Sequence, residues 1–169
     1  MFKEFLILIY DYFSISKKYL LFDFVTPFAV TLLLFFFKSN VLSLNDPLLG
    51  QEITLLGIIA GFNITALSVL TTANNTMIEK LKSVSSQNRI GGKKINLFQE
   101  LYIFISYSVL VSFIIIFFSF IGYILPIHAI FETWAVNFFS YFNVALTFHI
   151  FFLNVRNVSF IYFSFFNSK

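Results

Sequence analysis

The sequence predicts an all-α, polytopic membrane protein with four transmembrane helices, both termini in the cytoplasm and an interfacial helix at the N-terminus. The first observation behind this fold class is composition. Of the 169 residues, 59% are hydrophobic and only 11% are charged, whereas soluble domains carry about 25% charged residues. So few charges cannot cover a water-facing surface, so lipid must be the solvent. The second and third observations are the lengths of the apolar blocks and the placement of Lys and Arg.

Four apolar blocks are long enough to cross a bilayer. Its hydrocarbon core is about 30 Å thick and requires about 20 residues of helix, in which the backbone satisfies its own hydrogen bonds. Residues 19–37, 53–73, 101–125 and 134–155 meet this requirement. We expect Pro27 to kink the first block, because proline removes a backbone donor.

The two ends of the chain are too short or too polar to span. In the N-terminal segment 1–18, the apolar run Phe5–Tyr10 is followed closely by Asp11, Lys17 and Lys18. This pattern is typical of a helix lying on the membrane surface, although a plug or re-entrant segment stays open. The C-terminal tail 156–169 is expected at the interface or as an extension of the fourth helix.

Orientation follows from the basic residues, which are concentrated on one side of the predicted spans. With both termini inside, ten of the eleven Lys and Arg residues are cytoplasmic, and only Lys38 is outside, on the same side as Glu52. Cytoplasmic segments are enriched in such residues. The predicted cytoplasmic loop 74–100 alone holds five, which are candidates for binding an anionic ligand or, more simply, lipid headgroups: Lys80, Lys82, Arg89, Lys93 and Lys94.

Small and hydroxyl residues recur at helical spacing within the blocks. Such a stripe can either pack the helices of one protomer together or line a pathway between several copies. The pore-lining candidates are Thr54, Gly61, Thr65, Ser68 and Thr72, and the helix-packing candidates are Gly57, Gly61, Ser108, Ser112 and Gly122. On the second block, Asn63 lies nearly opposite Gly61, where it is expected to make a separate interhelical hydrogen bond.

Ionisable residues inside the blocks are few. Asp23 is expected to pair with Lys17, Lys18 or the basic loop, or else to act as a gating carboxylate. His149, among phenylalanines, is expected to be a packing residue rather than a metal ligand or pH switch. No catalytic cluster, metal site or cofactor motif is apparent, so we predict a protein that is not an enzyme and carries no cofactor.

Two functions fit these features. The first is a homo-oligomeric effector that forms an ion channel or permeability pore, gated from the cytoplasmic face by an anionic ligand such as a nucleic-acid oligomer. The alternative is a non-conducting anchor or sensor subunit that recruits a cytosolic partner protein through the basic loop. A small transporter is weaker, because the blocks show no inverted repeat.

The chain also resembles a known group of proteins. A short basic N-terminus, Gly-Phe-Asn-Ile-Thr-Ala at 61–66 in the second of four spans, and a basic loop before a Ser-rich third span are similar to small four-helix membrane components of bacterial anti-phage systems, of the Hailong-effector or Kiwa-subunit type. The first type implies a tetrameric channel in the bacterial plasma membrane, held shut by DNA oligomers. The second implies a membrane sensor with a DNA-binding partner. Neither resemblance assigns a binding residue.

Overall fold

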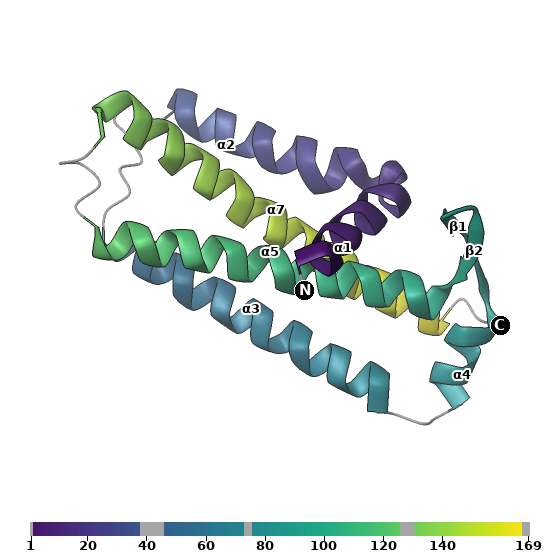
Figure 1. Cartoon of the computed structure of the whole chain (residues 1–169). Coiled ribbons are helices and arrows are strands. Elements are labelled where there is room, and N and C mark those ends of the chain that lie inside the picture. Colours follow the sequence, from purple (N-terminus) through teal and green to yellow (C-terminus); the bar gives the residue numbers. More distant parts are fainter. Residues whose placement is uncertain (1, 38–45, 73–75, 126–130, 167–169) are drawn as a thin grey trace.

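Four helical segments running back and forth form the body of the molecule (Figure 1). The computed structural model describes residues 2–37, 46–72, 76–125 and 131–166. The body comprises α2 (Thr26–Phe37), α3 (Asp46–Thr72), α5 (Leu97–Ile124) and α7 (Thr133–Phe166). Helix α5 lies between α3 and α7, and α2 packs on α7.

Among the described residues, three helices are long and apolar enough to cross a membrane: Pro47–Thr72, Leu97–Ile124 and Thr133–Tyr162. Their outward surfaces carry many exposed Phe, Leu and Ile side chains, which water would disfavour and lipid accepts. The chain is therefore a membrane protein. The long helices predicted at 53–73, 101–125 and 134–155 are confirmed, although α3 begins seven residues earlier and α7 extends well past 155.

The first predicted block is a shorter apolar helix, Leu21–Phe37. It opens with a π-helical turn, η2 (Leu21–Val25), which follows a 3-10 turn, η1 (Lys17–Tyr19). The π turn comes directly before Pro27, at the place where a kink was expected. Proline has no N–H to donate to the carbonyl one turn earlier, which belongs to Asp23. The wider π turn directs the backbone carbonyl and the side chain of Asp23 toward the neighbouring helices.

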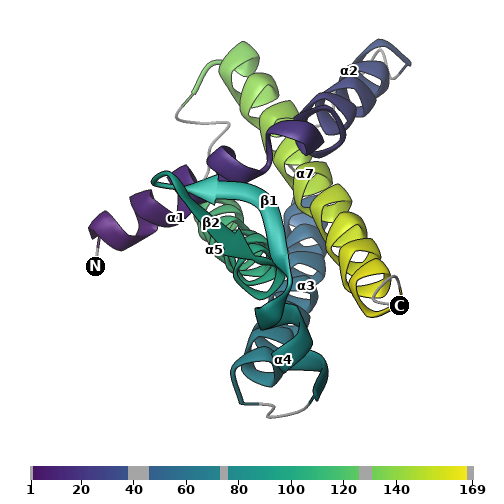
Figure 2. The same ribbon diagram turned by 90° about the vertical axis from the view of Figure 1, so that its right-hand side faces the viewer.

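Helix α1 (Phe2–Ile15) lies across the bundle rather than along it, and seen down the bundle it projects sideways (Figure 2). Tyr12 and Ile15 are buried against α5, while Leu6 and Tyr10 are more than half exposed. The helix therefore has one side that packs on the bundle and another apolar side that no other described element covers.

The segment 74–100, expected as a loop, is folded over its described part, residues 76–100. It contains α4 (Thr76–Ser83) and an antiparallel hairpin of β1 (Ser85–Ile90) and β2 (Lys93–Asn96). Gly91 and Gly92 form the two-residue turn with φ of 55° and 80°, a conformation that other residues adopt poorly. We call α4, β1 and β2 the basic module, and the end of the bundle that carries it the hairpin end; the opposite end, where α5 ends and α7 begins, is the far end.

No linker separates the hairpin from the long helix that follows. Strand β2 ends at Asn96 and α5 begins at Leu97. The Asn96 side chain accepts a hydrogen bond from the Gln99 backbone at 2.8 Å, and the Gln99 side chain accepts one from the Asn96 backbone at 3.0 Å. This capping box satisfies N-terminal donors of the helix. The Leu97 N–H also donates to the Val84 carbonyl at 3.0 Å, which ties the start of α5 to the start of the hairpin.

The buried apolar side chains form three clusters, two of which lie at the same level of α5. One joins α1 to α5 and α7, one joins α3 to α4 and α5, and one near the far end joins α3, α5 and α7. Their central members are Tyr12 and Phe104 in the first, Leu70 and Ile105 in the second, and Leu56, Ile115 and Ile150 in the third. Buried polar groups, described next, lie among and beyond these clusters.

Candidate functional site

The outward face of α3 carries the stripe singled out in the sequence. All of its members are exposed, and we call them the α3 stripe: Thr54, Gly57, Gly61, Thr65, Ser68 and Thr72. A Cβ atom added at Gly57 or Gly61 would meet nothing within 4 Å. The expectation that these two glycines pack helices together is therefore not met within the protomer. Three of the hydroxyls, those of Thr54, Thr65 and Thr72, donate to carbonyls of their own helix one turn back.

The opposite face of α3 carries polar residues that do meet other helices. The Asn63 amide donates to the Ser108 hydroxyl at 3.0 Å and to the Asn154 side-chain oxygen at 2.8 Å, and the Asn154 amide donates to Ser108 at 2.9 Å. This confirms the predicted interhelical bond of Asn63 and joins α3, α5 and α7. One turn along α5, Ser112 is also buried, but its hydroxyl has no partner among the described residues. Gly122 lies further toward the far end and is half-buried.

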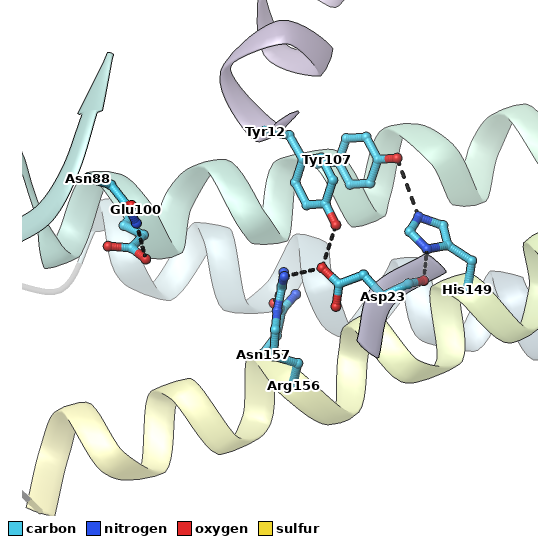
Figure 3. Close-up of polar contacts among 8 residues, drawn as sticks. All are labelled: Tyr12, Asp23, Asn88, Glu100, Tyr107, His149, Arg156 and Asn157. Carbon is cyan, nitrogen blue, oxygen red and sulfur yellow. Dashed lines mark hydrogen bonds and ion pairs between the residues drawn. The ribbon is translucent and has the colours of Figure 1, made fainter. Parts of the chain in front are cut away.

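Asp23 is fully buried and forms an ion pair with Arg156 of α7 (Figure 3). The expected partners, Lys17, Lys18 and the basic loop, are not the ones it contacts. The same carboxylate oxygen accepts from the Tyr12 hydroxyl at 2.6 Å. Residues from α1, η2 and the distant α7 therefore meet at one carboxylate.

The Arg156 guanidinium is enclosed by aromatic rings. It lies 4.0 Å from the Phe104 ring centroid and 5.0 Å from that of Tyr19, distances at which a cation is attracted to the ring face. Tyr12, which bonds Asp23, stacks on Tyr107 with ring centroids 3.5 Å apart. The pair is thus compensated by charge, hydrogen bonds and ring faces, and it anchors α1 to the bundle.

His149 completes this network, and Pro27 explains its position. Its Nδ1 lies 2.5 Å from the Asp23 backbone oxygen, the carbonyl that Pro27 leaves without a helical donor. Because a carbonyl oxygen only accepts, Nδ1 carries a proton, and Nε2 of a neutral ring accepts from the Tyr107 hydroxyl 3.3 Å away. Both ring nitrogens are occupied and the ring stacks on Phe24, which fits the expected packing role.

A second buried carboxylate lies toward the far end. Glu52 was expected outside the membrane, one residue before the second span, yet it lies within α3 with only 7% of its surface exposed. The Ser119 hydroxyl donates to it at 2.8 Å, and the Asn143 amide and Thr147 hydroxyl also donate. These four residues form the Glu52 cluster. No Lys, Arg or His contacts the carboxylate within the described ranges.

A cavity of about 480 Å³ adjoins the Glu52 cluster. Its walls come from α3, α5 and α7 and include the rings of Phe118, Phe139 and Phe142. The polar side chains that line it are Ser119 and Asn143, two of those that hold Glu52. The Glu52 cluster therefore contributes the polar part of the lining of an otherwise apolar cavity.

The basic module presents its cations to solvent. Lys80 and Lys82 lie on α4, Arg89 on β1, and Lys93 and Lys94 on β2, and all five are exposed. Two of them are directly opposite one another across the hairpin, at the pair Arg89 and Lys94. Like charges opposite each other in a sheet repel, so the module has a surplus of positive potential at that position.

Glu100 fixes the module to α5. This carboxylate is 2% exposed and accepts from the Ser86 hydroxyl and, at 2.9 Å, from the Asn88 amide (Figure 3). Both partners belong to β1. The bonds hold the hairpin against the first turn of the helix, so the five cations have a defined position.

Sequence reasoning found some of these groups and missed others. It identified the stripe, the five cations, Asn63, Asp23 and His149. It missed the burial of Glu52, Glu100 and Arg156, all of which fell outside the predicted spans. For Glu52 a signal was present, because the residue lies one helical period, four positions, before the buried Leu56. Comparison with protein-family models, curated proteins and solved structures finds no match to this chain.

Proposed function

We propose that this chain is a subunit of a homo-oligomeric membrane channel that is controlled by an anionic ligand acting on the basic module. The observation that carries the proposal is the outward position of the α3 stripe. Elsewhere the exposed surface of the long helices is rich in Phe, Leu and Ile. In lipid, helices associate by close packing of small residues, and the open space over Gly57 and Gly61 suits a neighbouring copy.

In this assembly the hydroxyls of Thr54, Thr65, Ser68 and Thr72 face a shared axis. Hydroxyl groups can line a path for ions without forming one tight site. A single chain of this size has too few helices for such a path, so association of copies is part of the proposal. By its resemblance to anti-phage effectors, we take four copies in a bacterial plasma membrane and a role in defence as the working assignment.

The topology proposed is four spans with both termini in the cytoplasm. The segment Leu21–Phe37 runs alongside α7 and would rise about 25 Å, close to the thickness of a bilayer core. Lys17, Lys18 and the basic module place many exposed cations at the hairpin end, which favours that end as cytoplasmic. Helix α1 then lies at the same interface with Leu6 and Tyr10 toward lipid.

The proposed ligand is a polyanion, and a nucleic-acid oligomer is the best candidate. Phosphates spaced along a strand can neutralise several Lys and Arg side chains at once, which makes binding strongly dependent on salt. The repulsion between Arg89 and Lys94 would be relieved by a phosphate lying between them. Because Glu100 holds β1 on α5, ligand binding at the hairpin has a direct connection to a long helix.

Ion flux across vesicles tests the channel. We expect purified protein in vesicles to pass monovalent ions, and the double variant T65L/S68L to reduce the flux at least tenfold, because leucine fills the axis. The control is Ser159→Leu, which replaces an exposed hydroxyl of α7 that likewise bonds its own helix. Flux lost equally in both variants, or absent from the unmodified protein with and without a DNA oligonucleotide, would contradict the channel.

A second function is favoured by one observation. Since the hydroxyls of Thr54, Thr65 and Thr72 already bond their own helix, the stripe can face lipid without unsatisfied donors. Under this alternative the chain is a non-conducting anchor or sensor that recruits a cytosolic partner protein through the basic module. T65L/S68L would then leave activity intact, whereas K93E/K94E would abolish it.

A further inference from the structure

Glu52 differs from the buried Asp23 in lacking a cation among its described contacts. A carboxylate removed from water costs several kcal/mol unless a positive charge compensates it. All three side chains that contact Glu52 are neutral, although each donates a hydrogen bond. An ionised Glu52 would therefore be a net negative charge in the interior, within about one helical turn of the buried Leu49 and Leu56 along α3.

The side chains around this charge are oxygen ligands. Two carboxylate oxygens, two hydroxyl oxygens and one amide oxygen come from α3, α5 and α7. The Asn143 amide now directs its nitrogen to Glu52 and also contacts the Ser119 hydroxyl at 3.1 Å. Rotation of this amide would present its oxygen at nearly the same place. Hard cations are bound by carboxylate, hydroxyl and carbonyl oxygens of this kind.

We propose that the Glu52 cluster is a binding site for a small monovalent metal cation, of which Na⁺ is the chemical type. One carboxylate balances one positive charge, whereas a divalent ion would leave a charge uncompensated in the interior. The oxygens of Ser119 and Glu52 are in hydrogen-bond contact at 2.8 Å, so they must move apart to admit an ion, and the smaller Na⁺ requires less movement than K⁺. The site faces the interior of one protomer, so it does not depend on the proposed channel.

The surroundings provide both access and insulation. Glu52 lies six residues from the first residue of α3, which places it about 9 Å along the helix from the far end. The cavity reaches the cluster at Ser119 and Asn143, so these two ligands have free space on one side and can rearrange. On the other side, Leu56, Ile115 and Ile150 separate the Glu52 cluster from the hydrogen-bonded group of Asn63, Ser108 and Asn154.

Thermal unfolding of the full chain in phosphatidylcholine nanodiscs tests the site. Unfolding midpoints are measured at one pH in NaCl, KCl or choline chloride of equal ionic strength. A ligand that binds only the folded state raises the midpoint, so we expect NaCl to raise it by several degrees over choline chloride, with saturation, and KCl to raise it less. Equal midpoints in NaCl and choline chloride would overturn the proposal.

Three variants assign the effect to this cluster. Glu52→Gln should abolish the response to Na⁺, and Thr147→Val, which keeps the charge but removes one oxygen, should weaken it at least threefold in apparent affinity. Glu100→Gln is the matched control, since Glu100 is a buried carboxylate also held by a serine and an asparagine; it should keep the full response. A response lost in E100Q and kept in E52Q would overturn the assignment.

Two other occupants are excluded by further arms of the experiment. If a proton rather than a metal ion neutralises Glu52, the unfolding midpoint of the unmodified chain will not respond to Na⁺. It will instead change with pH in a way that the Glu52→Gln variant does not. If the ammonium of Lys38, which lies outside the described residues, fills the site, Na⁺ will stabilise only the variant Lys38→Gln. Either result rejects a metal site in the unmodified chain.

Discussion

Asp23 and Glu52 are both buried in the bundle, and they are compensated in opposite ways. Asp23, near the hairpin end, pairs with the Arg156 guanidinium and accepts from Tyr12. Glu52, toward the far end, is held only by hydroxyl and amide groups. An acid paired with an arginine has a permanent counterion within the protein. An acid held only by neutral donors can bind and release a cation from solution. The contrast supports the proposed cation site at Glu52, whereas Asp23 connects η2 to α1 and α7.

Changing each acid to its amide is the sharpest way to break this comparison, and the largest effect is expected at Asp23. Asp23→Asn leaves the Arg156 guanidinium buried without its counterion, which should cost about 3–5 kcal/mol of unfolding free energy. The measurement is unfolding in a detergent titration. The double variant D23N/R156M removes both charges and should recover most of the loss. A D23N variant as stable as the unmodified chain would contradict the structural role.

Substitution of Asn63, which lies in a neutral hydrogen-bonded group between the two acids, should lower the unfolding free energy by an intermediate amount. Asn63→Leu removes two interhelical hydrogen bonds but leaves Ser108 and Asn154 bonded to each other. Single hydrogen bonds between membrane helices contribute about 0.6 kcal/mol and at most about 1.7, so we expect a loss of about 1 kcal/mol in the same titration. The variant Ile64→Leu, an exposed neighbour on α3, is the control. A loss as large as that of D23N would show that this group is more than packing.

The smallest loss is expected for Glu52→Gln without Na⁺. The amide keeps a hydrogen-bonding group in place and removes a charge that has no counterion, so the unfolding free energy in choline chloride should not fall. In NaCl the unmodified chain should become the more stable of the two. A loss in choline chloride that matches D23N would mean that an unseen counterion already compensates Glu52, and the contrast between the acids would fail.

Much of the helical framework could be predicted from the sequence, because uninterrupted apolar runs of span length have few other solutions in lipid. The ends of the helices were less predictable. The second block was predicted to begin after Glu52, since a charge ordinarily marks a membrane boundary. The helix includes that charge because partners from α5 and α7, between 67 and 95 residues away in sequence, receive it. Nothing local in the sequence reports such partners.

The basic module shows a different reason for error. Its strands are polar and lack a clear alternation of apolar and polar residues, so 74–100 was interpreted as a loop. The pair Gly91-Gly92 between these short segments was a local signal of a hairpin turn that the interpretation as a loop did not use. Likewise Arg156 was counted as a surface cation, since its acid lies 133 positions earlier in the chain.

The junction between hairpin and helix has a mechanical consequence. With β2 passing into α5 between Asn96 and Leu97, and the capping box and Glu100 bracing the corner, there is no slack at which a movement of the hairpin could be absorbed. A displacement of the hairpin would therefore be passed directly to the first turn of α5, the helix that contacts both α3 and α7.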